Sequence, residues 1–297
     1  MSCRYTAART TAEAVEALVA AKGEAHVIAG GVALVILMNE KLVEPSWLVD
    51  VSRIDALHGI DRLSDGTVRI GAAVTHREVA ESEIIAEAFP MMSEMAAEIA
   101  CGRIMNKGTI GGNICLADPQ GDPPITMLAL DATMRTVGPD GRRDIPVREF
   151  FVDLYETALR DDELLQEILI PPMKPGSITA FGKYAARKAM DYTSTISAAV
   201  RLIRGAGNGR IEEISLGLGG VGQTPVYSEA LEEMLTNVRP SDEVFGRVRE
   251  RLFAVMEPIE DHLYSANYKR HVAAVTLRRT VMKAFSGTWE GEGVLIR

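Results

Sequence analysis

The sequence is short of cysteine and of clustered histidine, and both shortages exclude kinds of metal site. Its 297 residues contain Cys3, Cys101 and Cys115, an odd count without a CxxC pair, which argues against a disulfide framework. An iron–sulfur cluster normally takes four cysteine ligands, so this chain is not expected to hold one alone. The five histidines form no HxxxH or HxH pair, so no zinc or non-haem iron site is expected.

Clustered basic charge and long apolar runs are also missing. The formal net charge is −9, which argues against nucleic acid as a partner because phosphate contacts need grouped Lys and Arg. The longest apolar run, residues 32–38, is broken by Asn39, Glu40 and Lys41 and is too short to span a membrane. The N-terminus shows no secretory signal, so we expect a cytoplasmic chain.

What is present begins with alternating strands and helices. A strand is expected at residues 25–28, then Gly30-Gly31, a helix at 32–42 and a strand at 47–51. This order is typical of a unit with parallel strands.

The middle of the chain changes to hairpins and one long loop. Residues 57–73 are expected to form a hairpin, and Thr75 to Glu78 is a capping box that opens a helical stretch. Residues 101–124 are dense in Gly, Asp, Asn and Pro, which predicts a long binding loop. A second hairpin is expected around residues 139–141, and a strand at 164–170.

A proline-rich linker at residues 171–176 is followed by a different pattern. Strands are expected at 178–188, 195–204 and 210–218, and helices over most of 228–285. We therefore predict an α+β chain of two domains.

The first predicted domain covers residues 1–174, with subdomains of about 1–56 and 57–174. The second covers 175–297 and is a small α+β domain built on an antiparallel sheet.

Two glycine loops are the candidate binding elements. Glycine allows close approach of a ligand to the backbone, and a helix N-terminus attracts anions, but Gly30-Gly31 alone favours a tight turn without a ligand. The second loop, residues 108–113, adds a hydroxyl and a carboxamide to exposed N–H groups, and Asp118 and Asp122 follow. The residues leave two interpretations open, a site for a diphosphate or dinucleotide and a polar surface loop.

Taken in order, seven segments resemble the FAD-binding medium subunit of the xanthine dehydrogenase and carbon monoxide dehydrogenase family. They are Ile28-Ala29-Gly30-Gly31 with Leu34, Leu48-Val49-Asp50-Val51, Gly71-Ala72-Ala73-Val74-Thr75-His76, Arg103-Ile104-Met105-Asn106-Lys107-Gly108-Thr109-Ile110-Gly111-Gly112-Asn113, Ala117-Asp118-Pro119-Gln120-Gly121-Asp122-Pro123-Pro124, Phe181-Gly182-Lys183 and Gly219-Gly220-Val221-Gly222-Gln223-Thr224-Pro225.

The resemblance implies a fold, a cofactor and partners. The fold would be an FAD domain of the vanillyl-alcohol-oxidase type (PCMH-like), followed by the small C-terminal domain. FAD would receive electrons from a small [2Fe-2S] subunit, after oxidation of substrate on a large molybdopterin subunit, and pass them to NAD, oxygen or a quinone. The few cysteines agree with clusters held on another chain, and exclude the relatives that carry an additional cluster in this subunit.

The resemblance also implies which residues contact FAD. Two stretches would hold the diphosphate, and Asp122 would hold a hydroxyl of the cofactor. Leu165 and Lys183 would lie near the isoalloxazine ring, and Ala100 would lie near the adenine. A cation beside the flavin N1–O2 edge stabilises the reduced anion, which gives Lys183 a role. Without the resemblance, Lys183 would be interpreted as a solvated lysine on an exposed strand position. The diphosphate stretches are Val27, Ile28, Ala29, Gly30, Gly31, Val32, Ala33 and Leu34, and Thr109, Ile110, Gly111, Gly112 and Asn113.

The sequence departs from the family at two positions. Many relatives carry Ser and Pro where this chain has Ala33 and Ile36. The missing hydroxyl removes one possible phosphate contact, worth about 1–2 kcal/mol, but leaves backbone contacts possible.

Other signals are given structural interpretations. Residues 217–222 satisfy G-x-G-x-x-G, but Gln223-Thr224-Pro225 interrupts the helix that a nicotinamide site would need, so a glycine-rich strand end packed against the first domain is expected. Cys101 and Cys115 are expected to be small buried fillers. His76 is expected to be structural.

The main hypothesis is thus an electron-relay flavoprotein subunit. A self-sufficient flavin oxidoreductase with its own substrate site is the alternative, and a scaffold without flavin is disfavoured by the intact glycines and Asn113. Tyr184 and Tyr192 are near Lys183 in sequence and are candidates to shield the ring.

Overall fold

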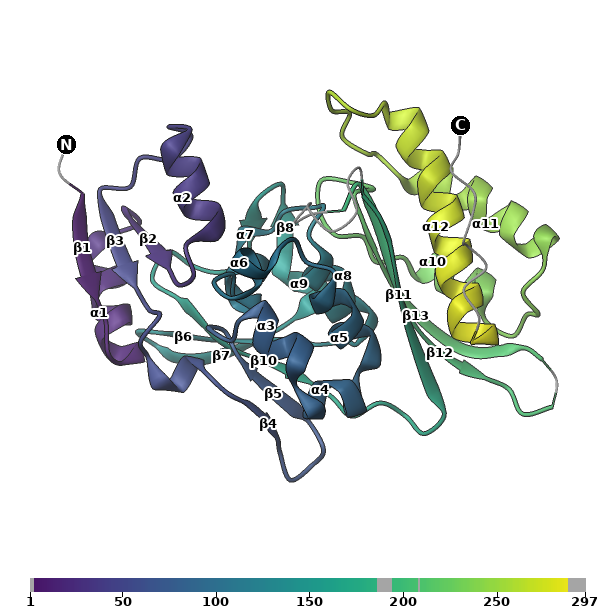
Figure 1. Cartoon of the computed structure of the whole chain (residues 1–297), viewed down its shortest axis with the longest axis horizontal. Coiled ribbons are helices and arrows are strands. Elements are labelled where there is room, and N and C mark those ends of the chain that lie inside the picture. The colour runs from purple at the N-terminus through teal and green to yellow at the C-terminus, as the bar shows by residue number, and fades with distance from the viewer. Residues whose placement is uncertain (1–2, 186–193, 208, 288–297) are drawn as a thin grey trace.

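The computed structural model describes residues 3–185, 194–207 and 209–287. Three main sheets follow one another along the length of the molecule, in chain order (Figure 1). The mixture of helix and sheet, with the five-stranded sheet and the C-terminal three-stranded sheet antiparallel, confirms the predicted α+β class. The predicted domain boundaries stay a prediction.

The first sheet is parallel, as the β–Gly-Gly–α–β pattern predicts. Its order is β1 (Arg4–Ala7), β3 (Trp47–Asp50) and β2 (Ala25–Ile28), and β1 is a strand that the sequence analysis missed. Helix α1 (Thr11–Ala21) buries its apolar side against this sheet. Helix α2 (Val32–Asn39) ends three residues earlier than predicted, and none of its residues is buried.

The second sheet is antiparallel and contains both predicted hairpins. Its order is β4-β5-β10-β6-β7, and Leu165, Ile168 and Ile170 of β10 enter a large core. Several helices lie beside this sheet (Figure 1). A short 3-10 helix, Asp55–Leu57, precedes the sheet. The bounds are β4 Ile60–Arg62, β5 Val68–Gly71, β6 Thr133–Gly138, β7 Gly141–Pro146, β10 Leu164–Ile170, α3 His76–Glu81, α4 Glu83–Ala88, α5 Pro90–Ala97 and α9 Val147–Phe150, with the small pair β8 Phe151–Asp153 and β9 Glu156–Thr157.

The single long loop predicted for residues 101–124 is wrong. The stretch contains α6 (Gly102–Met105) and α7 (Ile110–Leu116), and α8 (Asp122–Ala129) begins within it. Glycine-rich sequence has low intrinsic helix propensity, so these short helices depend on caps and on tertiary contacts. Their short connections hold the glycines in fixed positions.

The third sheet joins the two halves of the molecule. It is antiparallel, in the order β11 (Ser177–Tyr184), β12 (Ile196–Arg204) and β13 (Ile211–Gly219). Side chains alternate between its faces, so that neighbouring residues enter different cores: Phe181 and Ala199 enter the core of the second sheet, whereas Ala180 and Ala198 pack beneath the C-terminal helices. These helices are α10 Glu229–Leu235, α11 Asp242–Val255 and α12 Ala266–Ser286.

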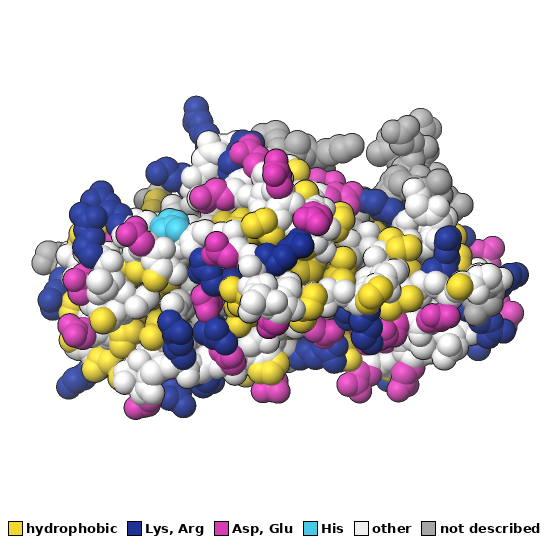
Figure 2. Space-filling view, turned by 90° about the horizontal axis from the view of Figure 1, so that it is seen from below, with side chains coloured by type: hydrophobic (Ala, Val, Ile, Leu, Met, Phe, Trp, Pro, Cys, Tyr) yellow, Lys and Arg dark blue, Asp and Glu magenta, His cyan; other side chains and the backbone are white. Residues whose placement is uncertain are grey.

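The surface is mixed in charge. On the face shown in Figure 2, basic and acidic side chains alternate and apolar side chains gather in small groups. Among the described residues, no helix is both long enough and apolar enough to cross a membrane.

Candidate functional site

The two glycine loops touch each other. A Cβ atom built on Gly30 would lie 1.6 Å from the main-chain oxygen of Lys107, so only glycine allows this approach. Gly31 has φ +73° and is the N-cap of α2, a backbone conformation that glycine adopts without strain. Residues far apart in the sequence therefore form one surface.

The second loop is held from below by the end of β5. The N–H of Gly111 donates to the oxygen of Ala72 at 3.0 Å, and a Cβ on Gly111 would lie 2.5 Å from that oxygen. Thr109 caps α7 by accepting a hydrogen bond from the N–H of Gly112 at 3.1 Å. Hydrogen bonds and close packing within the protein thus hold this loop in place.

His76 supports the same loop. Its ring is buried, its backbone N–H donates to the Gly108 oxygen at 3.0 Å, and its Cδ2 would lie 3.0 Å from a Cβ on Gly108. Burial lowers the pKa of His76 to about 4, so the ring is neutral at physiological pH. This environment agrees with the structural role expected from the sequence.

The upper surface of both loops remains open. Val27 and Gly112 are exposed, and residues 28–34 and Asn113 are half-buried. Oδ1 of Asn113 is buried and has no hydrogen-bond partner within the described protein. A buried polar atom without a partner is costly, so a ligand donor there would be stabilising.

Contacts continue from the second loop to Lys183. Oδ1 of Asn113 lies 3.2 Å from the position of a Cβ on Gly121, the residue that precedes Asp122. Asp122 starts α8 with its side chain fully buried and accepts a hydrogen bond at 2.8 Å from Nζ of Lys183. Residues from both sides of the proline linker thus belong to one cluster.

The remaining predicted residues lie next to this cluster. Nζ of Lys183 also donates to the main-chain oxygen of Glu98 at 3.3 Å. Glu98 lies two residues before Ala100, which is buried and has φ +46°. Leu165 is buried on β10. The next residue on that strand, Gln166, accepts a hydrogen bond at 3.0 Å through its main-chain oxygen from the N–H of Ala72, which lies beneath Gly111.

The structure therefore brings the predicted site residues into one continuous region, with different exposures. Six of them are buried: Ala100, Thr109, Ile110, Gly111, Asp122 and Leu165.

Sequence reasoning missed two partners of this cluster. Ser194 donates its hydroxyl to Oδ1 of Asp122, and the oxygen of Glu98 accepts from Lys183. Neither has a local signal, since Ser194 is 72 residues from Asp122 and Glu98 acts through its backbone.

The two cysteines beside the second loop differ in chemistry. The buried filler role predicted for Cys101 is wrong, because this residue is exposed, and N–H groups of Ile104 and Arg103 lower the pKa of its thiol. Burial raises the pKa of the Cys115 thiol to about 12, which agrees with the predicted filler role for that residue.

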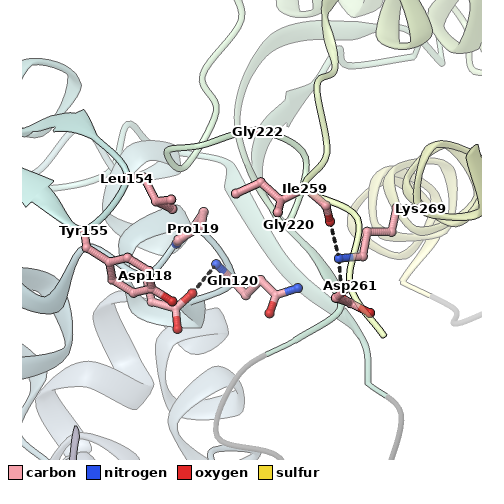
Figure 3. A pocket seen from close by; sticks show the side chains of 10 residues that line it. All are labelled: Asp118, Pro119, Gln120, Leu154, Tyr155, Gly220, Gly222, Ile259, Asp261 and Lys269. Atoms are coloured by element: carbon pink, nitrogen blue, oxygen red, sulfur yellow. Dashed lines mark hydrogen bonds and ion pairs between the residues drawn. The ribbon is translucent and has the colours of Figure 1, made fainter. Parts of the chain in front are cut away.

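A separate pocket lies between the two halves of the chain. It has a volume of about 180 Å³, and Asp118, Gln120, Tyr155, Asp261 and Lys269 are among its lining residues (Figure 3). None of the predicted cofactor residues lines it. Ligand pockets usually measure about 300–1,000 Å³, so this space suits a small ligand and not a dinucleotide.

The G-x-G-x-x-G segment is the end of a strand. Leu218 pairs with Val226, so the chain folds back where a nicotinamide site would require a helix. A Cβ on Gly217 would lie 2.3 Å from the oxygen of Ile125 in α8, so the strand packs closely against the first half.

The two tyrosines near Lys183 have different outcomes. Tyr184 faces away into an aromatic group, with its hydroxyl 2.7 Å from that of Tyr268. Tyr192 lies outside the described residues.

Comparison with known families matches both halves of the chain. Residues 1–173 match the family described as the FAD binding domain in molybdopterin dehydrogenase, and residues 180–284 match the CO dehydrogenase flavoprotein C-terminal domain.

Individual relatives match over nearly their full lengths. The chain is 31% identical to the 6-hydroxypseudooxynicotine dehydrogenase complex subunit alpha of Paenarthrobacter nicotinovorans, over 94% of this chain and 93% of that protein. It is 32% identical to the carbon monoxide dehydrogenase medium chain of Hydrogenophaga pseudoflava, over 95% and 96% respectively. The reconstituted CO dehydrogenase from Oligotropha carboxidovorans superposes with a TM-score of 0.92 at 32% identity, over 97% of this chain and 99% of that one.

Proposed function

The chain belongs to the FAD-binding medium subunits of the molybdenum hydroxylases, the family of xanthine dehydrogenase and carbon monoxide dehydrogenase, and on that premise we propose that it relays electrons from an iron–sulfur partner subunit to an external acceptor. It is an oxidoreductase subunit, and its cofactor is FAD. The observation that supports a cofactor here is the buried Oδ1 of Asn113, which has no hydrogen-bond partner in the described protein and belongs to the second of the two glycine loops that meet at Gly30.

The residues around this contact fit FAD. The N-terminus of α2 begins at Gly31, beside this contact and without a side-chain cap, and unpaired N–H groups at a helix N-terminus stabilise phosphate. The first N–H groups of α7 are already paired within the protein. Oδ1 of Asn113 has no partner within the described protein and can accept a hydrogen bond, which a cofactor hydroxyl would donate. We propose that the diphosphate is held by Val27, Ile28, Ala29, Gly30, Gly31, Val32, Ala33 and Leu34 on one side and by Thr109, Ile110, Gly111, Gly112 and Asn113 on the other.

Ala100, Leu165 and Lys183 complete the proposed site. Leu165 and Ala100 are apolar and buried, so they would form a dry boundary for the rings. Bound FAD supplies the ability to exchange electrons singly or in pairs. Lys183 would place a positive charge at the site and stabilise negative charge on the ring.

A direct bond from Asp122 to a cofactor hydroxyl stays a prediction. Both of its carboxylate oxygens already accept hydrogen bonds, from Lys183 and from Ser194, and its side chain has no exposed area. Such a bond would require the carboxylate to move or to share one of these donors.

Partner subunits would have to supply the other redox centres. The chain has three cysteines, fewer than one [2Fe-2S] cluster normally uses, and its described part contains no cluster of potential metal ligands. We therefore propose a small [2Fe-2S] subunit and a large molybdopterin subunit as partners. NAD, oxygen and a quinone remain alternative acceptors.

Co-expression with the neighbouring genes tests the proposal. We expect a complex that contains FAD, iron and molybdenum, in which substrate bleaches the flavin only when the iron–sulfur subunit is present. Bleaching of the complex by NADH would identify a nicotinamide acceptor.

Two outcomes would contradict the relay. A colourless complex that does not retain added FAD would remove its basis. Substrate turnover by this chain without partners would instead favour the self-sufficient flavin oxidoreductase.

A further inference from the structure

We infer that Asp122 is a positioning residue, which acts on the flavin by holding Lys183 and balancing its charge. The inference rests on the proposed function for the location of the flavin ring. It differs from a direct contact between Asp122 and the cofactor, and the two roles have different experimental signatures.

The first argument is the enclosure of Asp122. Its side chain is completely buried, with Lys183 on Oδ2 and Ser194 on Oδ1. Burial raises the pKa of Asp122, and the neighbouring ammonium group opposes that rise. Because the Asp122 carboxylate has no exposed area, it can bind only the groups that surround it. In this structure those groups belong to the protein.

The second argument is the number of donors on Lys183. An ammonium group has three N–H donors, and Lys183 uses one on Asp122 and one on the Glu98 oxygen, at 2.8 and 3.3 Å. One donor is left for a ligand. Only 8% of the Lys183 side chain is exposed, so its position depends on these two acceptors.

The third argument is that the pair joins separate parts of the fold. Lys183 is on β11 of the third sheet, whereas Asp122 starts α8 and Glu98 follows α5. A carboxylate in the first turn of a helix is favoured by the helix dipole, which keeps Asp122 in place. Asp122 therefore fixes the side chain of a residue that the C-terminal half contributes.

The structure also contains a matched pair for comparison. Lys283 on α12 pairs with Glu94 on α5, across the same boundary, and its Nζ also donates to the oxygen of Phe181. This pair has the same charges and joins the same parts, but it contains none of the proposed cofactor residues.

The test measures the reduction potential of bound FAD in the assembled enzyme, by equilibration with reference dyes. Asp122→Asn keeps the size and one acceptor oxygen but removes the negative charge beside Lys183. Because the Glu98 oxygen still holds Lys183, whose charge is then no longer balanced, we expect the potential of the flavin to become more positive, with less than a tenfold loss of FAD affinity. Lys183→Met should shift the potential in the opposite direction.

A double variant separates action through Lys183 from other effects. If Asp122 acts through Lys183, adding Asp122→Asn to Lys183→Met should cause no further positive shift. Glu94→Gln, the matched control, should shift the potential less than Asp122→Asn does, because Glu94 is paired with Lys283 and not with Lys183. A tenfold or larger loss of FAD affinity in Asp122→Asn, with an unchanged potential, would overturn the inference and support a direct bond.

A second readout does not need the flavin. Acylation of lysines by a soluble active ester, followed by mass spectrometry, should modify Lys183 several-fold faster in Asp122→Asn than in the parent protein. Equal rates would contradict the holding role. If the parent protein binds no FAD but Lys183 still shows this difference, the proposed function fails while the positioning contact stands.

Discussion

Gly30 and Lys107 meet so closely that the carbonyl oxygen of Lys107 occupies the place where any other residue at position 30 would carry its Cβ, 1.6 Å away. The contact joins the loop after β2 to the loop before α7. The relative position of the two proposed diphosphate-binding loops is therefore fixed by backbone against backbone.

Gly30→Ala should weaken FAD binding while leaving most of the fold intact. The added methyl group must push the two loops apart, and overpacking of this kind costs about 1–3 kcal/mol, equivalent to a loss of affinity of roughly 5- to 150-fold if all of it opposes binding. Titration of FAD by fluorescence quenching measures the loss, and circular dichroism checks the fold. Unchanged affinity would show that the two loops do not act as one site.

Gly246→Ala should stabilise the protein. Gly246 lies inside α11, and a Cβ there would meet nothing within 4 Å. Replacing an interior helix glycine by alanine typically gains about 0.5–1 kcal/mol. Urea unfolding measures the change, and FAD affinity should equal that of the parent protein, so the variant is also the control for Gly30→Ala. Destabilisation would mean that the helix is irregular at this position.

His76 should make the protein acid-sensitive. Its pKa is about 4 in the folded state, against 6.5 for a solvated histidine, so the unfolded chain binds more protons between these values. Stability is complete above about pH 6.5 and is lost as the pH falls towards 4, by about 2 kcal/mol between pH 7 and pH 5. Urea unfolding at both pH values should show this loss in the parent protein.

The variant His76→Gln isolates that contribution. It lacks the ionisable ring, so its stability should fall less between the two pH values, whatever its stability at pH 7. Equal pH dependence in both proteins would show that the His76 ring takes up its proton in the folded state.

Cys101 should react with iodoacetamide much faster than Cys115. The thiolate is the reactive form, the pKa of the exposed Cys101 thiol is lowered, and that of Cys115 is raised to about 12. Peptide mass spectrometry after brief labelling gives both rates. Cys101→Ser should abolish the fast phase assigned to Cys101, and labelling of Cys115 at a similar rate in folded protein would contradict its burial.

Local signals in the sequence predicted much of the fold. Thr75 and Glu78 form the predicted capping box, because that contact spans three residues and needs no distant partner. Gly66 and Gly141 marked the two hairpin turns, where both have positive φ. The family resemblance then identified the cofactor and the class of enzyme.

Features that depend on distant contacts could not be predicted. Helix α7 has the sequence IGGNICL, which has two glycines and only one strong helix former, Leu116, and it is held by Thr109 and by the packing of Gly111 on Ala72. The pairing of Lys183 with Asp122 joins residues 61 positions apart. No periodic pattern in the sequence records such a contact.

The close approach at Gly30 also affects how related sequences are interpreted. Glycine is required at that position by the oxygen of Lys107, whether or not a flavin is bound. A relative that had lost its flavin would still be constrained to keep it, so this glycine is a poor marker of a working cofactor site. The buried pair of Asp122 and Lys183 is a better one, since an apolar pair of similar volume can replace buried charges at little cost once their ligand is lost. Joint replacement of both residues would therefore be the signature of a degenerate subunit.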